Sequence, residues 1–226
     1  MKAIKRLLVG TPGKESAFEV EYDETTTVLD ALEMIRHGGE RSLKYRHSCH
    51  HGSCGTCGAV INGKEALMCL ERLDKLEGDT ITIAPLGRFT FIGDVAVHPA
   101  RLYDSMVVGA RSEDKEATYL RESRRDVDLP VPPDTSGRTR FEDCIECGLC
   151  TNACPVSDSF LGPQSLAQIS RGMENNPESR DALLDLASGN DGATKCERHL
   201  ACSRVCPTGV MPAKHIQLLK NALAKR

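Results

Sequence analysis

The sequence predicts an α+β protein with two small domains: a mixed domain of strands and one helix over residues 1–100, and a nearly all-α domain over residues 101–226. Strand and hairpin patterns are confined to residues 1–100, whereas helical patterns dominate the C-terminal part. Between them, the polar stretch 122–139 has three prolines within four positions. With 226 residues and 40% hydrophobic content, the chain is long enough to bury two cores.

The first domain is expected to begin with a hairpin. Residues 3–9 and 17–22 have the composition of strands and are joined around Pro12-Gly13. Thr27 is a suitable N-cap for a helix whose apolar residues recur at helical spacing until Gly38-Gly39 ends it. We expect this helix to pack on the strands.

A second hairpin is predicted at Asn62-Gly63, because both residues tolerate a positive φ between the apolar runs 59–61 and 66–68. Residues 80–84 alternate Thr and Ile and supply the last strand of a small sheet that holds one helix.

The second domain follows a crossing segment, 87–99, in which His98 is expected to be structural. Segment 122–139 is expected to be a linker, or an extended segment lying across a partner. Helices are expected at 164–171, 179–187 and 213–225.

Composition limits the function. The chain has 29 basic and 32 acidic residues without a basic block, so we expect no nucleic-acid partner. The N-terminal apolar run, Leu7 to Gly10, is too short for a signal peptide, and no later run is long enough for a transmembrane helix. We expect a reducing compartment, where the 11 cysteines serve as metal ligands or redox groups.

The first cysteine group has the spacing Cys49-x4-Cys54-x2-Cys57, with Cys69 further along, which is the plant-type [2Fe–2S] pattern. The loop is rich in glycine, so backbone N–H groups can approach inorganic sulfide. A thioredoxin-like dithiol lacks its βαβ context, and a zinc ribbon lacks a near partner for Cys69. A Rieske centre lacks a second cysteine–histidine motif in this domain, so His50 and His51 are expected to be exposed loop residues.

The remaining seven cysteines form two groups on one template. Cys144-x2-Cys147-x2-Cys150-x3-Cys154-Pro155 is the bacterial ferredoxin run, in which the fourth cysteine serves the other cluster. The group at Cys196, Cys202 and Cys206 matches it except that His199 replaces one cysteine. Cross-ligation predicts a [4Fe–4S] cluster on Cys144, Cys147, Cys150 and Cys206, and a [3Fe–4S] cluster on Cys154, Cys196 and Cys202. The alternative is that His199 ligates a fourth iron.

Three clusters without a G-x-G-x-x-G loop or an acid–base constellation indicate an electron conductor with no catalytic residues of its own. A zinc-stapled interaction module is the alternative from another class, and visible absorption distinguishes the two.

The chain resembles, over nearly its whole length, the iron–sulfur subunit of succinate dehydrogenases and quinol:fumarate reductases. The motifs that carry the resemblance lie at 22–32, 45–58, 144–155, 161–163 and 196–207. The resemblance implies a plant-ferredoxin-like (β-grasp) domain with the [2Fe–2S] cluster, then a bacterial-ferredoxin-like helical domain with the [4Fe–4S] and [3Fe–4S] clusters.

It further implies a flavoprotein partner with FAD, and a membrane-anchor partner with quinone and, as a further candidate, haem b. The complex would serve the tricarboxylic acid cycle or fumarate respiration, peripherally on the cytoplasmic face of the inner membrane. The alternative keeps the electron relay but replaces the substrate by another enoate, or the acceptor by a thiol/disulfide subunit.

The chain departs from many succinate dehydrogenases at two places: it has no Trp after the first Cys-Pro, and Glu197 follows Cys196 where many carry His. The fumarate reductase branch also lacks that Trp. The family's quinol-side pattern Ile-Gln-x-x-Lys recurs here with Gln217 and Lys220, which share one helical face. These two residues either meet a quinone together or form a solvated polar face.

Overall fold

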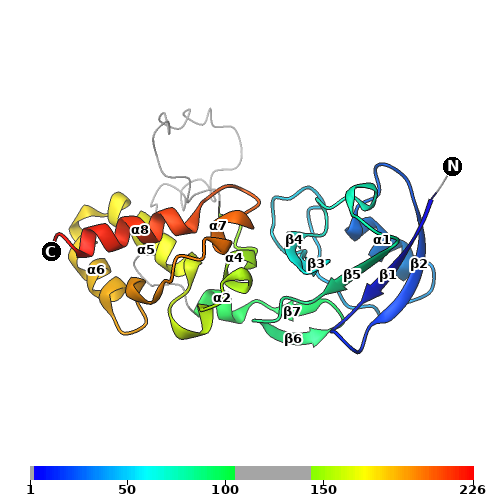
Figure 1. Ribbon diagram of the computed structural model, residues 1–226, viewed down its shortest axis with the longest axis horizontal. Helices are drawn as coiled ribbons and strands as arrows, with labels where there is room; N and C mark the ends of the chain where they lie inside the picture. The colour runs from blue at the N-terminus through cyan, green and yellow to red at the C-terminus, as the bar shows by residue number, and fades with distance from the viewer. Residues whose placement is uncertain (1–2, 105–143) are drawn as a thin grey trace, which may run out of the picture.

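The computed structural model describes residues 3–104 and 144–226, so the predicted linker 122–139 lies outside the described residues. A sheet-rich domain and a helical region lie end to end, with the N-terminus at the far end of one and the C-terminus at the far end of the other (Figure 1). Among the described residues, no helix is both long enough and apolar enough to cross a bilayer.

The first domain is built on a five-stranded sheet in the order β2-β1-β5-β3-β4. Its strands are β1 (Ala3–Val9), β2 (Ser16–Tyr22), β3 (Gly58–Ile61), β4 (Lys64–Leu67) and β5 (Thr80–Ala84). β1 runs parallel to β5, and the other neighbours are antiparallel. Both predicted hairpins form, and the alternating Ile residues of β5 are buried. A short 3₁₀ helix, η1 (Leu73–Lys75), precedes β5.

Helix α1 (Val28–His37) begins where the sequence predicts. Thr27 Oγ1 accepts a hydrogen bond from Asp30 N at 3.1 Å, and Asp30 Oδ2 accepts one from Thr27 N at 2.9 Å. This capping box satisfies two backbone donors that a helix start leaves unpaired. Val28, Leu29, Ala31 and Leu32 enter the core of the first domain.

The crossing segment, 87–99, contains strands, although residues 80–84 were predicted to be the last strand of the first domain. It contains a second, two-stranded sheet of β6 (Thr90–Gly93) and β7 (Ala96–His98), followed by α2 (Ala100–Asp104). The pairing shifts register between Phe91 and Gly93, and neighbouring Phe91 and Ile92 are both exposed, so the alternation that identifies a strand is absent. His98 Nδ1 accepts a hydrogen bond from Ala100 N at 3.1 Å, which supports the expected structural role.

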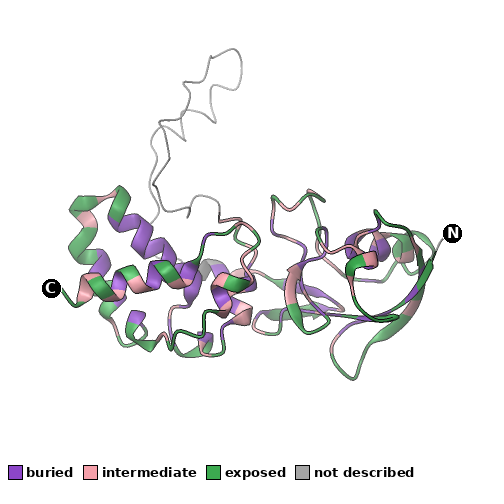
Figure 2. Ribbon diagram, turned by 45° about the horizontal axis from the view of Figure 1, so that its top comes forward, coloured by how far each residue is buried: buried purple, intermediate pink, exposed green. Residues whose placement is uncertain are grey.

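The C-terminal region is helical and contains no strand among residues 144–226. Its helices are α4 (Leu149–Ala153), α5 (Pro163–Asn175), α6 (Arg180–Ser188), α7 (Ala201–Arg204) and α8 (Pro212–Leu223). Three single 3₁₀ turns lie between them: η3 (Ser157–Ser159), η4 (Pro177–Ser179) and η5 (Ala193–Lys195). α5 packs against α6 and α8, and most of α5 is buried (Figure 2).

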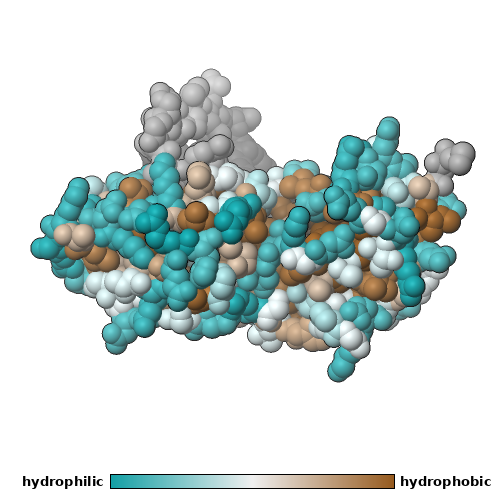
Figure 3. All heavy atoms as spheres, viewed as in Figure 1, coloured by the Kyte–Doolittle hydropathy of each residue, from teal (hydrophilic) through white to brown (hydrophobic). Residues whose placement is uncertain are grey.

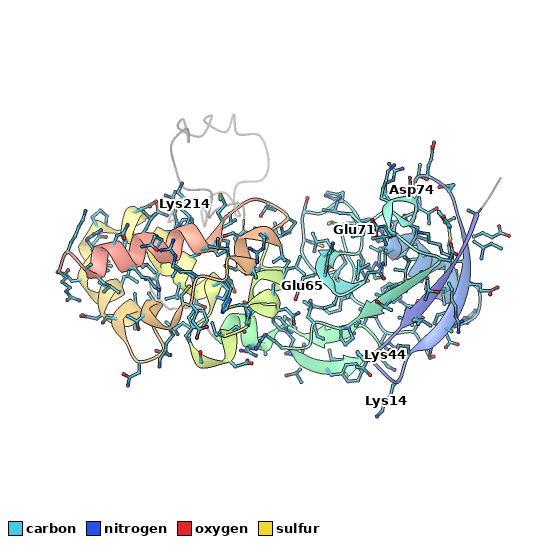
Figure 4. All side chains as sticks on the ribbon, in the orientation of Figure 1. Lys14, Lys44, Glu65, Glu71, Asp74 and Lys214 are labelled. Carbon is cyan, nitrogen blue, oxygen red and sulfur yellow. The ribbon has the colours of Figure 1, made fainter. Side chains whose placement is uncertain are left out.

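Side chains from both domains meet at their boundary. Leu149 of α4 belongs to the same buried cluster as Phe89 and Leu102. Asn152 of α4 donates to Glu65 Oε1 at 2.9 Å, and Glu65 lies between the two domains in Figure 4. Their relative position is therefore fixed by direct contacts within the described residues.

The surface is mixed, with hydrophobic residues showing among polar ones over the sheet domain in Figure 3. Leu70, directly after Cys69, is 49% exposed. A Cβ on Gly52 would lie 3.1 Å from the Leu70 side chain, so this leucine borders the first cysteine loop.

Candidate metal centres

The first cysteine loop lies between α1 and β3, and Cys69 follows β4. Cys57 Sγ and Cys69 Sγ are 3.3 Å apart, well beyond the disulfide bond length of about 2.05 Å. Cys49 Sγ accepts hydrogen bonds from the backbone N–H groups of Ser53 and Cys54, each at 3.3 Å. The structure thus brings the thiols together in a loop whose amides point at sulfur. His50 and His51 are exposed, as expected.

The thiols of this loop differ in their electrostatics. A backbone hydrogen bond from His51, helped by contacts with Cys54 and Ser53, lowers the pKa of Cys49 to about 6. Burial raises the pKa of Cys57 to about 12, and the nearby Cys69 and Cys54 thiolates add to this effect. Ionising several such thiols side by side is costly unless a cation lies between them. The donor set therefore fits an iron–sulfur cluster.

The second set lines one cavity in the helical region, formed by Cys144, Cys147, Cys150 and Cys206. Val210 N donates to Cys206 Sγ at 3.3 Å. Burial raises the pKa of Cys147 to about 11 and holds that of Cys150 well above its ordinary value, with neighbouring thiolates adding to both shifts. Cys206, remote in sequence from the other three, joins them as cross-ligation predicts.

The third set, Cys154, Cys196 and Cys202, lines a separate cavity together with His199. Burial raises the pKa of Cys154 and of Cys202. His199 Nε2 lies 3.0 Å from Glu197 Oε2, so its ring nitrogen has a carboxylate partner. The structure leaves three thiols and no fourth in this cavity.

The two cysteine runs of the helical region share a backbone pattern. Two and four residues after Cys144, Glu146 and Gly148 have positive φ of 54° and 76°. At the same offsets from Cys196, Arg198 and Leu200 have φ of 61° and 60°. The chain therefore curls in the same way in both runs, and His199 occupies the backbone position that Cys147 has in the first.

The first two cysteine sets approach each other across the domain boundary. Gly55, between Cys54 and Cys57, has φ of +69°, and a Cβ there would lie 2.5 Å from Ile145 O and 2.9 Å from Cys147 Cβ. A Cβ on Gly58 would lie 3.2 Å from Cys147 O. Only a glycine lets the two cysteine-bearing loops pack this closely.

A polar network, which sequence reasoning missed, holds the same boundary. Arg88 donates from its backbone N–H to Asn152 Oδ1 at 3.1 Å and from Nη2 to Pro155 O at 3.0 Å. Its guanidinium also pairs with Asp158, which Arg101 contacts at 2.6 Å. Arg88 and Arg101 are separated from these acceptors by 57 or more residues in the chain, so no local sequence pattern predicts the contacts.

The two residues of the predicted quinone vicinity have different surroundings. Lys220 is half-buried, and its Nζ donates to the Cys196 carbonyl at 2.7 Å. Gln217, which is also half-buried, instead donates to Asn221 Oδ1 at 2.9 Å in an exposed hydrogen bond. Lys220 is thus tied to the third cysteine set, while Gln217 is tied to its own helix.

The sheet domain and the helical region each bring cysteine thiols together, and the loops that carry these thiols pack against each other. This arrangement places the chain in the class of multi-cluster iron–sulfur proteins. A family described as "2Fe-2S iron-sulfur cluster binding domain" matches residues 10–104, and one described as "4Fe-4S dicluster domain" matches residues 140–210. The chain thus carries both kinds of cluster-binding domain.

Curated relatives that match most of the chain identify the family within this class. The chain is 32% identical over 222 residues to the fumarate reductase iron-sulfur subunit of Haemophilus influenzae, covering 93% of this chain and 86% of that protein. It is 33% identical over 219 residues to the corresponding subunit of Mycobacterium tuberculosis, covering 92% and 85%. The mitochondrial succinate dehydrogenase [ubiquinone] iron-sulfur subunit of Dictyostelium discoideum is 29% identical over 217 residues, covering 87% and 72%.

The chain therefore belongs to the family of iron–sulfur subunits of fumarate reductases and succinate dehydrogenases, as its motifs predicted. It is an electron-transfer iron–sulfur subunit of such an oxidoreductase complex. A solved structure, "Mycobacterium smegmatis Sdh1 complex in the apo form", has a similar fold: the TM-score is 0.74 at 22% identity, covering 100% of this chain and 96% of that one.

Proposed function

We propose that the chain relays single electrons between the FAD of a flavoprotein subunit and a quinone held by a membrane anchor, in a complex that interconverts succinate and fumarate. The observation that carries the proposal is the packing of Gly55 against Cys147, because it keeps one cysteine loop beside the next. Iron–sulfur clusters supply reversible one-electron chemistry when bound. The protein's part is to hold them at short, fixed separations.

The proposed ligands follow the three thiol sets. Cys49, Cys54, Cys57 and Cys69 hold a [2Fe–2S] cluster; Cys144, Cys147, Cys150 and Cys206 hold a [4Fe–4S] cluster; Cys154, Cys196 and Cys202 hold a [3Fe–4S] cluster. The last two assignments are supported by the two cavities that these cysteines line. In fold terms, residues 1–100 form a plant-ferredoxin-like (β-grasp) domain and residues 101–226 a bacterial-ferredoxin-like domain.

The proposed partners lie at opposite ends of the relay. The flavoprotein contacts the first domain, a proposal supported by exposed Leu70 next to the first cysteine loop. The membrane anchor, with its quinone and haem b as a further candidate, contacts the helical domain at the cytoplasmic face of the inner membrane. Lys220 and Gln217 lie in the quinone vicinity, and the hydrogen bond of Lys220 to the Cys196 carbonyl supports this for Lys220.

The test is anaerobic purification of the native complex, identification of its subunits, and iron analysis of this chain. We expect a flavoprotein, an anchor and about nine irons per chain. The chain alone should not turn over succinate or fumarate, because its sequence has no G-x-G-x-x-G loop for a flavin. Iron near eight with zinc present contradicts the three-cluster assignment. Co-purification of a thiol/disulfide subunit instead of an anchor contradicts the quinone.

A further inference from the structure

We propose that Glu33, His47 and His50 form a surface site for a divalent transition-metal ion of the Zn²⁺ class. Their ligand atoms converge on one point between α1 and the first cysteine loop. His47 Nδ1 lies 3.2 Å from Glu33 Oε1, and His50 Nε2 lies 3.6 Å from the same oxygen. The two ring nitrogens are 3.1 Å apart.

This triangle has the dimensions of a coordination face. A tetrahedral zinc ion with bonds of about 2.0–2.1 Å separates its ligand atoms by about 3.3–3.4 Å. The three observed separations, 3.1, 3.2 and 3.6 Å, lie around that value. Two imidazoles and a carboxylate also form the ligand set of many open zinc sites, in which water takes the fourth position. Side-chain exposures of 29%, 32% and 38% leave room for that water.

Hydrogen bonds among Glu33, His47 and His50 explain the arrangement of these side chains less well than metal coordination does. At 3.6 Å, the contact from His50 to Glu33 is too long for a hydrogen bond. If both rings carried a proton on the facing nitrogens, two N–H groups would oppose each other across 3.1 Å. If neither did, two lone pairs and a carboxylate would face one another. If only one did, its proton would join the two rings at 3.1 Å, but the lone pair of the other nitrogen would then face the Glu33 carboxylate at 3.2 or 3.6 Å. A cation at the centre satisfies all three groups at once.

The fold holds the three residues in place independently of any ion. Glu33 lies on α1, which is fixed to the core by Leu29 and Leu32. The His47 ring packs beside Tyr45 at 5.3 Å between centroids, and Arg36 of α1 lies over the Tyr45 ring at 5.7 Å. Supports of this kind orient the ligands of a metal site.

His50 connects the site to the first cysteine loop, because it directly follows Cys49 and has a positive φ of 62°. A bound ion would tie α1 to this loop and add positive charge beside it. Positive charge favours the more negative, reduced form of a nearby cluster, so loading should raise the [2Fe–2S] reduction potential. This consequence rests on the proposed function, whereas ion binding itself does not.

The binding test uses the purified protein with its clusters, dialysed against Zn²⁺, with zinc and iron measured in the same sample. We expect one added zinc per chain in the wild type, and an affinity lower by about tenfold or more in His47→Gln and Glu33→Gln. His37→Gln, an exposed histidine at the end of α1, is the matched control and should bind like the wild type. Zinc X-ray absorption should show nitrogen and oxygen ligands only.

Absence of zinc from the wild type, equal affinity in all variants, or sulfur ligands to zinc would each overturn the site. Sulfur would mean that zinc entered a damaged cluster. The coupling is tested by redox titration of the [2Fe–2S] signal: a positive shift on zinc loading is expected in the wild type and not in His47→Gln. Zinc binding without that shift refutes the coupling, while the presence of the [2Fe–2S] signal itself tests the cluster assignment separately.

Discussion

Replacement of Gly55 by alanine tests whether the domain boundary positions the first two cysteine sets. The new Cβ would meet Ile145 O at 2.5 Å, whereas ordinary contacts begin at 3.4 Å, so the loops must separate by about 0.9 Å. Gly13→Ala is the matched control: its φ is +84°, also in the left-handed region, but nothing lies within 4 Å of its Cβ. The control variant therefore has the energetic cost of a left-handed alanine without a steric contact like the one between the new Cβ at residue 55 and Ile145 O.

The two variants should differ in how much stability they lose. A left-handed alanine costs about 1–2 kcal/mol, which applies to both. Overpacking at a tight contact adds about 1–3 kcal/mol for Gly55→Ala alone. Each kcal/mol lowers the melting temperature by about 2–4 °C in a protein of this size. We expect decreases of about 2–8 °C for Gly13→Ala and about 4–20 °C for Gly55→Ala.

The first assay is the apparent melting temperature of the cluster-loaded protein, measured at one scan rate because cluster loss makes unfolding irreversible. The second assay is electron paramagnetic resonance of the reduced protein. Gly55→Ala should weaken the magnetic interaction between the [2Fe–2S] and [4Fe–4S] clusters, and Gly13→Ala should leave it unchanged. Equal melting decreases together with an unchanged interaction in both variants would refute the argument that this contact sets the spacing.

Four further substitutions test the third cysteine set, the quinone vicinity and the polar network at the domain boundary. His199→Cys should convert the three-iron cluster to a second [4Fe–4S] cluster, so the three-iron resonance of the oxidised protein should largely vanish. Lys220→Ala should impair quinone-coupled turnover of the complex but spare turnover with an artificial acceptor that takes electrons earlier, and Gln217→Leu should do the same to a smaller extent. Hydrogen bonds from Arg101 and then Arg88 lower the pKa of Asp158, so its carboxylate stabilises the fold at neutral pH and this contribution is lost as the pH falls through the lowered pKa. Asp158→Asn should therefore melt below the wild type at pH 7, with the difference shrinking below about pH 4.

Each of these has a contradicting outcome. If oxidised wild type prepared anaerobically shows no three-iron signal, His199 is a ligand and the cluster has four irons. Equal loss in both turnover assays, or none, favours the solvated polar face for Lys220 and Gln217. For the acid dependence, Asp79→Asn is the control, because Asp79 is exposed and its carboxyl group has no side-chain partner among residues 3–104 and 144–226. A difference for Asp158→Asn that stays constant with pH contradicts the ion-pair explanation.

Most elements of the fold were predictable because their signals are local. Asn62-Gly63 forces a tight turn, and Thr27 with Asp30 marks a helix start within four residues of sequence. Part of each cysteine set is also local: Cys144, Cys147 and Cys150 line one cavity and Cys196 and Cys202 another, whereas Cys206 and Cys154 each line the cavity of the other run. Cys206 was placed with the first run only because the template repeats.

What escaped prediction depends on contacts between distant residues or on broken alternation. The β6–β7 hairpin has consecutive exposed apolar residues and a register shift, so no period of two is visible. The Arg88–Asp158 pair joins residues 70 apart. His50 is an exposed loop residue as expected, but nothing in the sequence places Glu33 beside it.

The two cysteine runs show why a glycine is required in one and not in the other. Gly148 and Leu200 occupy equivalent left-handed positions, so the turn alone does not demand glycine. A Cβ on Gly148 would lie 2.6 Å from Phe89 Cζ, inside the domain boundary, whereas Leu200 is 47% exposed beside the third cysteine set. Glycine is therefore kept where the first domain packs, and a leucine is tolerated where nothing in the described residues covers it.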